Sequence, residues 1–305
     1  MIETFTCEDY NLHLTLYPSF TLCLFKRVDS NCFIKCFGLY KGLKFYTDNS
    51  RFFVEYPGNI SHEYIMFLSG LWFDPYRFYH ILPRSIHDLI YPLIEVYGGV
   101  RISIAPFDRK YVFISTFLSR RTSYYGNVLR WCNKLFEIID DGLNISYDNV
   151  RNIGGSYQLL QLPDAYSRYM SEVYSDELSL RPIDVKRKLL SIGFVGPKVA
   201  NAYLLFTRRS SWVTPCDVHY RRFIRRLNLF DGKDLVYPVK SLCIRFYGEC
   251  KNCRLAENCM EYQSILKFGF LSGWVQTISY IHDTLYCMKN KCRECPFRSV
   301  CHLTS

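Results

Sequence analysis

The sequence lacks the features of secreted, membrane-spanning and disordered proteins. It begins MIETFTCEDYNLHL, where early acidic residues stand in place of the basic and apolar regions of a secretory signal. No run of about 18 apolar residues is present, so a membrane-spanning helix is not expected. No low-complexity tract interrupts the 305 residues. These absences predict a soluble intracellular protein, in the cytoplasm or nucleoid, with no membrane partner.

Acidic residues are too few to neutralise the basic ones. The chain has 38 Lys and Arg against 28 Asp and Glu, a formal net charge of +10. A basic surface attracts polyanions by releasing their counterions, although many basic proteins bind none. Hydrophobic residues make up 49% of the chain and aromatic residues 17%, which indicates a packed globular core.

The order of the predicted elements indicates an α+β fold. Residues 20–56 contain short aromatic and β-branched runs separated by turn residues, which predict three or four antiparallel hairpin strands. Helical periodicity follows at residues 60–71, 75–82, 85–97, 123–139, 163–174 and 182–192. We predict a β-rich domain over residues 1–90, a mostly helical domain over residues 91–286 with a cysteine loop at 243–259, and a C-terminal cysteine loop at 287–305.

Residues 189–227 combine a glycine-bearing turn with a lysine and an aspartate, in the segment LLSIGFVGPKVANAYLLFTRRSSWVTPCDVHYRRFIRRL. Gly193 and Gly196 permit a tight turn whose backbone N–H groups suit a phosphate, although such a turn is more often a plain connection. Lys198 falls in the first turn of the next helix, where the helix dipole lowers the pKa of its amine. A neutral amine can attack an electron-poor sugar carbon and form a Schiff base.

Asp217 opens the basic helix that follows. Aspartate is a preferred N-cap residue, so one interpretation is purely structural. A carboxylate held at that point could also stabilise positive charge that develops on a deoxyribose ring. Arg120 and Arg121 are similarly open to two interpretations, as a solvated surface pair or as contacts to a DNA phosphate or an exposed base.

Eight of the 14 cysteines form two clusters with similar spacing. A C-x2-C pair with short flanking loops can bring four thiolates around a metal ion or an iron–sulfur cluster. We expect two [4Fe–4S] clusters, or one cluster and one zinc ion. The first quartet has the spacing C-x6-C-x2-C-x5-C and the second C-x4-C-x2-C-x5-C, and the predicted ligands are Cys243, Cys250, Cys253, Cys259, Cys287, Cys292, Cys295 and Cys301.

The turn, Lys198 and the Pro-x-Asp-Val-His segment at 215–219 together resemble the helix-hairpin-helix DNA glycosylases, in particular the lyase-competent branch with endonuclease III and the 8-oxoguanine DNA glycosylases. Two further segments extend the resemblance over roughly residues 95–286. Gly99-Val100-Arg101-Ile102 is similar to the entry of the glycosylase domain of the 8-oxoguanine enzymes. Gly273-Trp274-Val275-Gln276 is similar to their Gly-Trp-Ala-Gln segment.

The resemblance implies a role for each matching residue. Lys198 falls at the Schiff-base nucleophile and Asp217 at the catalytic carboxylate, and Gln276 matches a glutamine that reads the Watson–Crick edge of a flipped oxidised guanine. Such enzymes must extrude the target base to reach its glycosidic bond. For Gln276 the alternative is an ordinary buried helix position, as it is for Tyr280, which matches a stacking aromatic. The residues that match DNA contacts are Gly193, Val195, Gly196, His219, Arg120 and Arg121.

The chain also departs from the family pattern. The usual Leu-Pro-Gly-Val-Gly hairpin is replaced by Ile192-Gly193-Phe194-Val195-Gly196, which displaces the first glycine by one position. Arg120 and Arg121 stand where an asparagine or glutamine usually fills the gap in the DNA.

The resemblance implies a bifunctional DNA glycosylase/AP lyase that acts on damaged double-stranded DNA as a monomer, with 8-oxoguanine as the favoured base. The cysteine loops resemble those of endonuclease III and leave an oxidised-pyrimidine glycosylase/AP lyase as one alternative. A non-catalytic iron–sulfur DNA-binding protein is the other.

Overall fold

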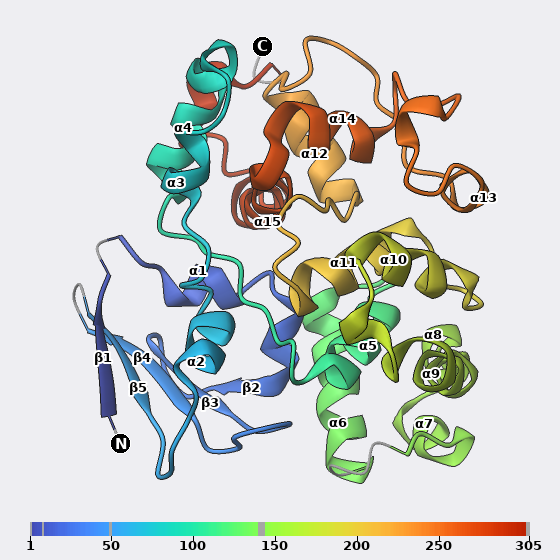
Figure 1. The fold of residues 1–305 in the computed structure, drawn as a ribbon. Helices are drawn as coiled ribbons and strands as arrows, with labels where there is room; N and C mark the ends of the chain where they lie inside the picture. The colour runs from blue at the N-terminus through green and yellow to red at the C-terminus, as the bar shows by residue number, and fades with distance from the viewer. Residues whose placement is uncertain (1, 8, 49–50, 140–143, 303–305) are drawn as a thin grey trace.

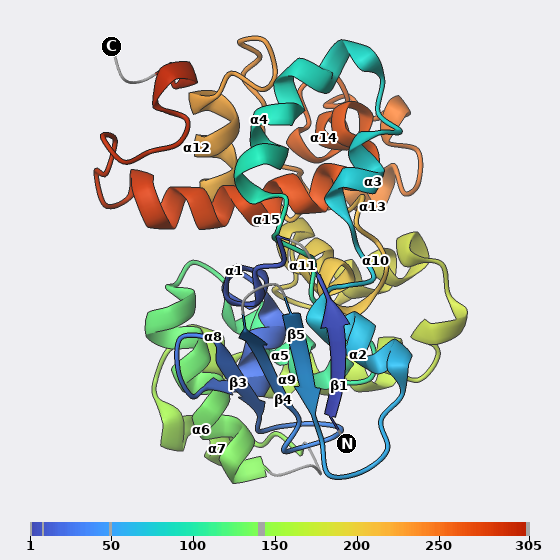
Figure 2. The same ribbon diagram turned by 90° about the vertical axis from the view of Figure 1, so that its left-hand side faces the viewer.

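The computed structural model describes residues 2–7, 9–48, 51–139 and 144–302, and within them the chain is arranged in two halves (Figure 1). The lower half in this view contains the sheet and the helices that pack beside it, α5 to α11. The upper half contains α3, α4 and the helices from α12 onward. Figure 2 shows α15 (Ser272–His282) lying along the boundary between the halves. Across the described ranges, every helix is too short or too polar to span a bilayer.

The N-terminal sheet is antiparallel, as predicted, and has the strand order β1-β5-β4-β3-β2. Phe45 pairs with Val54, and both side chains are buried with Phe33 and Phe52 on the inner face of the sheet. Alternation of buried and more exposed residues along β3, β4 and β5 therefore fixes the register. The strands span Ile2–Thr6 (β1), Phe25–Arg27 (β2), Cys32–Lys35 (β3), Lys44–Asp48 (β4) and Arg51–Glu55 (β5).

Two details of the sheet differ from the prediction. Residues Phe20–Leu24, expected to be extended, form a 3-10 helix, because Ser19 caps the turn by accepting a hydrogen bond from the Thr21 N–H. Their consecutive burial does not have the alternation of a strand. The sheet also gains β1, which pairs with β5 and was not predicted.

The helices predicted after the sheet are confirmed as α2, α3 and α4, which begin and end close to the expected residues. The boundary predicted at residue 90 falls inside α4, and α3 and α4 lie in the upper half, away from the sheet (Figure 1). The N-terminal segment therefore contributes to both halves. These helices and the short α1 span Leu12–Leu16 (α1), His62–Ser69 (α2), Pro75–Tyr79 (α3) and His87–Tyr97 (α4).

The lower half is completed by helices that surround α5, whose residues are almost all buried. The helix predicted over residues 123–139 begins as a π-helical turn at Tyr124–Val128 and continues as α6. The bounds are Arg109–Leu118 (α5), Leu129–Ile139 (α6), Tyr147–Ile153 (α7), Tyr157–Leu160 (α8) and Leu162–Tyr169 (α9).

The hairpin segment crosses from one half to the other. Pro182 and Pro197 begin α10 and α11, where the fixed backbone angle of proline suits the first helical turn. The chain then passes upward to α12, so that α11 and α12, which are close in sequence, belong to different halves (Figure 1). The bounds are Pro182–Ser191 (α10), Pro197–Thr207 (α11), Val218–Arg226 (α12), Lys240–Arg245 (α13) and Met260–Phe268 (α14).

Gly273 allows α15 to approach the segment that leads into α12. Its N–H donates to the Ser211 carbonyl oxygen at 2.7 Å. A Cβ atom at this position would lie 2.7 Å from the Ser211 oxygen and 2.9 Å from the Val213 oxygen. Only glycine fits this contact without a shift of the backbone, and the contact brings Gln276 close to Asp217.

Candidate active site

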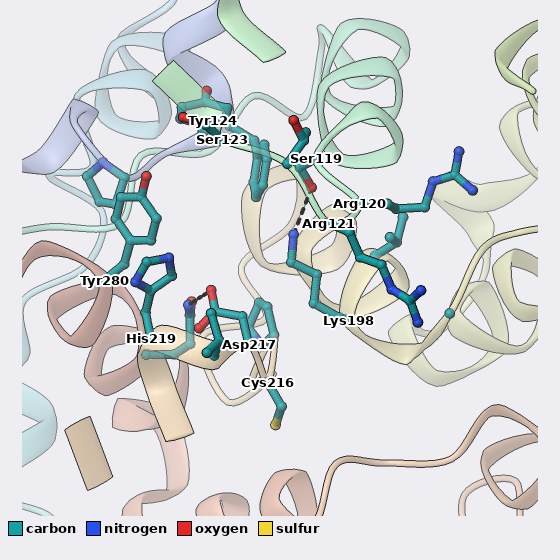
Figure 3. Close-up of a pocket in the computed structure, with 18 of the residues that line it drawn as sticks. Ser119, Arg120, Arg121, Ser123, Tyr124, Lys198, Cys216, Asp217, His219 and Tyr280 are labelled. Atoms are coloured by element: carbon teal, nitrogen blue, oxygen red, sulfur yellow. Dashed lines mark hydrogen bonds between the residues drawn. The ribbon is translucent and has the colours of Figure 1, made fainter. Parts of the chain in front are cut away.

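A cleft of about 1440 Å³ is lined by residues from both halves of the molecule. Lys198 comes from the lower half, on α11, and Asp217 from the upper half, at the start of α12. Figure 3 shows their side chains on facing sides of the cleft, with Tyr280 and His219 farther along the Asp217 side. Predicted site residues that line the cleft are Lys198, Asp217, Gln276, Tyr280, His219, Arg120, Arg121 and Gly196.

Lys198 lies in the first turn of α11, as predicted. Its Nζ donates to Ser119 Oγ at 2.7 Å and lies 5.0 Å from the centre of the Phe20 ring. Burial among these groups lowers the pKa of Lys198 to about 8, although the Asp217 carboxylate opposes this shift. A larger fraction of this amine than of an ordinary lysine is therefore neutral and nucleophilic close to neutral pH.

Asp217 is both a helix cap and a cleft residue. Its Oδ1 accepts from the Tyr220 N–H at 2.8 Å, and its Oδ2 accepts from Gln276 Nε2 at 3.3 Å. Burial raises the pKa of Asp217, while His219, the Tyr220 N–H and Lys198 oppose that shift. The N-cap bond fixes the carboxylate in place, so the structural interpretation and the catalytic one are compatible.

Gln276 and Tyr280 project from successive turns of α15 into the cleft. Tyr280 makes an edge-on ring contact with His219, with ring centres 4.7 Å apart, and a tilted contact with Tyr17 at 6.1 Å. Gln276 is buried, and in the structure its side chain bonds to Asp217. The two residues predicted to recognise a base therefore lie beside the predicted catalytic carboxylate.

His219 is held in position by Asp283, a residue not predicted from the sequence. The His219 Nδ1 lies 2.7 Å from Asp283 Oδ2, and the same oxygen accepts from Arg222 Nη1 at 2.8 Å. Arg226 Nη1 reaches Asp283 Oδ1 at 3.5 Å. Burial opposes ionisation of Asp283, but these three partners together hold its pKa below the ordinary value. One buried carboxylate thereby orients three basic side chains of α12.

The hairpin has its left-handed residue at Phe194, with a φ angle of +65°. Gly193 does not have a positive φ angle, and a Cβ atom there would meet nothing within 4 Å. Val195 is buried beneath the turn, and Gly196 is the N-cap residue of α11. The displaced glycine thus leaves an aromatic residue at the position of the turn where glycine is favoured.

The two arginines before α6 occupy different environments. Arg120 Nη1 donates to Gln161 Oε1 at 2.9 Å, and its guanidinium lies 3.8 Å from the centre of the Phe117 ring. Burial lowers the pKa of Arg120 to about 10, which leaves it charged at neutral pH. Arg121 is exposed and has a φ angle of +49°. Figure 3 shows both guanidinium groups on the Lys198 side of the cleft, away from Tyr280.

The cysteine quartets line two small cavities outside the cleft. Among the described residues, none of these eight cysteines takes part in a disulfide bond. Within the described ranges, no three His, Cys, Asp or Glu side chains converge closely enough to hold a single metal ion. A cavity of about 40 Å³ is bordered by Cys243, Cys250, Cys253 and Cys259, and one of about 100 Å³ by Cys287, Cys292, Cys295 and Cys301.

Three residues that line the cleft or position a residue of it were not predicted from the sequence. Ser119 precedes Arg120 and accepts the Lys198 hydrogen bond, yet an isolated serine carries no motif. Asp283 follows the Gln276 helix without a recognisable spacing. Tyr17 lines the cleft next to Tyr280 from a segment placed before the predicted sheet. None of the three had a sequence signal beyond its residue type.

Comparisons with known proteins agree with this architecture, although no family model matches the chain. A curated protein of Methanothermobacter thermautotrophicus named a probable N-glycosylase/DNA lyase is 29% identical over 115 residues, which are 35% of this chain and 34% of that protein. The chain thus matches about a third of the length of that relative.

Solved structures extend the likeness to nearly the whole chain. The 8-oxoguanine glycosylase/lyase of Clostridium acetobutylicum, bound to double-stranded DNA with cytosine opposite 8-oxoG, has a TM-score of 0.67 at 18% identity and covers 93% of this chain and 97% of its own. A 3-methyladenine DNA glycosylase from Archaeoglobus fulgidus has a TM-score of 0.61 at 14% identity, covering 93% and 99%. The chain therefore has the fold of the helix-hairpin-helix DNA glycosylases, and the predicted α+β class is confirmed.

Proposed function

We propose that the protein is a bifunctional DNA glycosylase/AP lyase of base excision repair. The observation that carries the proposal is the pairing, across one cleft, of the Lys198 amine, whose pKa is lowered, with the half-buried Asp217 carboxylate. The fold and the curated relative support the same reaction class. Its partner is damaged double-stranded DNA, which the basic chain would bind as a monomer.

The reaction begins at the sugar carbon C1′ of an extruded nucleotide. Neutral Lys198 Nζ bonds to C1′ while the bond from C1′ to the base breaks, and the base leaves with the electron pair and takes up a proton from the lysine nitrogen. Asp217 stabilises the positive charge that develops on the sugar. The C1′–O4′ bond then opens, with a proton passing to O4′, to give an imine. Water then takes a proton from C2′, the electrons of that C–H bond form a C2′–C3′ double bond, and the 3′ phosphate leaves with the electrons of the C3′–O bond, which cuts the strand.

An oxidised purine, 8-oxoguanine, is the base that we favour. Because Gln276 Nε2 donates to Asp217, the amide oxygen of Gln276 is turned toward other partners. That oxygen suits the N–H groups on the Watson–Crick edge of a guanine-type base, and the Tyr280 ring offers a stacking surface beside it. Proteins with this fold are named for both 8-oxoguanine and 3-methyladenine, so the preference depends on these side chains and not on the fold.

We also propose that the quartets hold two [4Fe–4S] clusters, with zinc at one of them as the alternative. A single zinc ion needs four sulfurs about 2.3 Å from one point. The four thiols of each quartet border one cavity, and the loop spacing resembles that of the iron–sulfur loop of endonuclease III, which favours a cluster. Their cysteines would serve as thiolate ligands, and the clusters would have a structural or redox-sensing role outside the reaction.

The cysteine loops keep the endonuclease III-like alternative open, in which the substrate is an oxidised pyrimidine. In a non-catalytic DNA-binding protein, by contrast, the Lys198 amine would have no covalent role. The pKa of about 8 favours the catalytic proposals.

Trapping with borohydride tests the reaction, because hydride reduces the imine to a stable link between Lys198 and DNA. Wild-type protein should become covalently attached to duplexes with 8-oxoguanine or an abasic site, and less to duplexes with thymine glycol or uracil. Lys198→Gln should abolish the adduct. Lys188→Gln, which changes a lysine on α10 that is paired with Asp176, is the matched control and should trap normally. An adduct that persists in Lys198→Gln would overturn the nucleophile assignment.

A further inference from the structure

Phe194 has a strained backbone and an exposed side chain at the same time. Its φ angle of +65° lies in the left-handed region, which is unfavourable for a bulky residue. The residue is 56% exposed, so the ring gains little from burial in the core. Glycine would satisfy the turn without strain, so neither turn geometry nor core packing accounts for an aromatic residue here.

Arg120 supports Phe194 from the protein side. Its guanidinium lies 5.8 Å from the centre of the Phe194 ring, and its Nη1 is 3.4 Å from the Phe194 carbonyl oxygen. Tyr157 and Phe117 contact the other parts of the same guanidinium, at 5.7 Å and 3.8 Å from their ring centres. Phe194 and Tyr157 are exposed and Arg120 is half-buried, so these three form a charged and aromatic ridge, whereas Phe117 is fully buried.

The ridge stands at the edge of the reaction cleft. Phe194 and Arg120 both line the cleft, on the Lys198 side. Arg120 directly follows Ser119, whose hydroxyl accepts the Lys198 hydrogen bond, and Phe194 belongs to the turn that begins the Lys198 helix. A nucleotide whose C1′ reached Lys198 would therefore leave its empty place in the duplex close to this ridge.

Arg120 also retains an unused donor. Its Nη2 is buried, and within the described part of the chain no acceptor meets it. A buried guanidinium nitrogen without a partner is unfavourable, so the Arg120 side chain would be stabilised if it turned Nη2 toward an acceptor on a ligand. Base edges and phosphates of DNA supply such acceptors.

We propose that Phe194 is a wedge that enters the base stack of DNA at the gap left by the extruded nucleotide, with Arg120 as its support and as a donor to the DNA. The inference rests on the proposed function for the existence of that gap. An apolar side chain between base steps stabilises unstacked DNA, and an adjacent cation lowers the electrostatic cost of close approach to the phosphates.

The test compares the affinities for two duplexes that differ only in one nucleotide, one intact and one with a tetrahydrofuran abasic analogue. Phosphate contacts are the same in both, so the ratio of the two affinities measures gap filling. Phe194→Gly should lower the ratio about tenfold, the loss expected for one stacking contact. Phe194→Asn, which tolerates the left-handed backbone but has no ring, should lower it similarly, and Phe194→Tyr should preserve it.

Thermal stability is an independent measurement, and in Phe194→Gly it should change in the opposite direction to the selective affinity for the abasic duplex. Phe194→Gly removes backbone strain and should raise the melting temperature by about 2 °C while it weakens selective binding. Leu178→Ala, which truncates an exposed apolar residue outside the cleft, is the control and should leave the affinity ratio unchanged.

An unchanged affinity ratio in both Phe194→Gly and Phe194→Asn would overturn the wedge. A lower melting temperature in Phe194→Gly would show that the ring stabilises the fold and would contradict the strain argument. Failure of the proposed function is distinguishable, because it would appear as absence of borohydride adducts in wild-type protein, whatever the affinity ratio of the Phe194 variants.

Discussion

The His219 Nδ1 lies 2.7 Å from Asp283 Oδ2, and this contact joins two helices that carry different parts of the cleft. His219 belongs to α12, which begins at Asp217, whereas Asp283 directly follows α15, which carries Gln276 and Tyr280. Because Asp283 is 1% exposed and also accepts from two arginines of α12, it fixes the angle between these helices. The two helices that carry Asp217, Gln276 and Tyr280 are thus fixed relative to each other.

Asp283→Asn should lower both the free energy of unfolding and the affinity for DNA. The variant loses charged hydrogen bonds to His219 and two arginines, which should lower the free energy of unfolding by about 2 kcal/mol. Stability from this carboxylate is fully present above the ordinary Asp pKa of about 3.9 and is lost as the pH falls through the lower folded value. Urea unfolding at pH 7 and at pH 3 measures the difference, which should shrink at the lower pH.

His219→Ala is the matched variant for Asp283→Asn. His219 is partly exposed at the cleft, so its truncation should affect DNA affinity more than stability. Equal loss of stability in the two variants would mean that the arginine contacts contribute nothing.

The rate of adduct formation should rise with pH and level off above about pH 8. The reactive form of Lys198 is the neutral amine, and burial lowers its pKa to about 8. An unperturbed lysine would place this inflection close to 10.4, about two units higher. Single-turnover trapping on abasic DNA between pH 6 and pH 10 measures the profile. Ser119→Ala removes an acceptor of the ammonium form, so it should move the inflection to lower pH.

Gly273→Ala should lower both stability and excision. The new Cβ would lie 2.7 Å from the Ser211 oxygen and 2.9 Å from the Val213 oxygen, so α15 must move away from the Asp217 segment. Overpacking of this kind costs about 1–3 kcal/mol. The shift also separates Gln276 from Asp217, so excision of 8-oxoguanine should slow more than cleavage of a preformed abasic site. Gly155→Ala, where a Cβ meets nothing within 4 Å, is the control.

The parts of the cleft that could be predicted from the sequence are those whose residues lie close together along the chain. Lys198 and Asp217 could be predicted because they lie in one short segment of turn and helix caps, whose signals are local. The bond from Lys198 to Ser119 spans 79 residues and that from His219 to Asp283 spans 64, and neither leaves a local pattern. Contacts of this kind depend on how helices pack, which single-residue patterns do not encode.

In the fold, too, local features could be predicted from the sequence, whereas contacts between residues far apart in the chain could not. The helices at residues 60–97 were predicted because their apolar spacing and turn residues are local. The strand β1 was not predicted, since its sequence is short and polar and it forms by pairing with β5, far along the chain. Residues Phe20–Leu24 were expected to be extended because of their β-branched and aromatic content, but the Ser19 cap favours a helical turn. Local hydrogen bonding overrode intrinsic propensity there.

The two quartets should support different parts of the cleft. Residues of α10, the first helix of the hairpin, border the first cavity, and Lys240 just before Cys243 donates to the Ile192 carbonyl oxygen at 3.0 Å. The second cavity is bordered by Phe223 and Arg226 of α12 and by His282 of α15. The first quartet is therefore expected to stabilise the hairpin. The second is expected to stabilise the side of the cleft that carries Asp217 and Gln276.

Cys250→Ser and Cys292→Ser form a matched pair, because both are exposed residues and each belongs to one quartet. Each variant should lose the iron or zinc of its own quartet and keep that of the other, as measured by metal and sulfide analysis of anaerobically purified protein. Cys250→Ser should weaken DNA binding about tenfold, or about 1.4 kcal/mol, yet trap normally at saturating DNA. Cys292→Ser should slow single-turnover excision at saturating DNA. Cys36→Ser lies outside both quartets and should change neither DNA binding nor excision. Slowed excision in Cys250→Ser together with weakened DNA binding in Cys292→Ser would contradict the roles given to the two quartets.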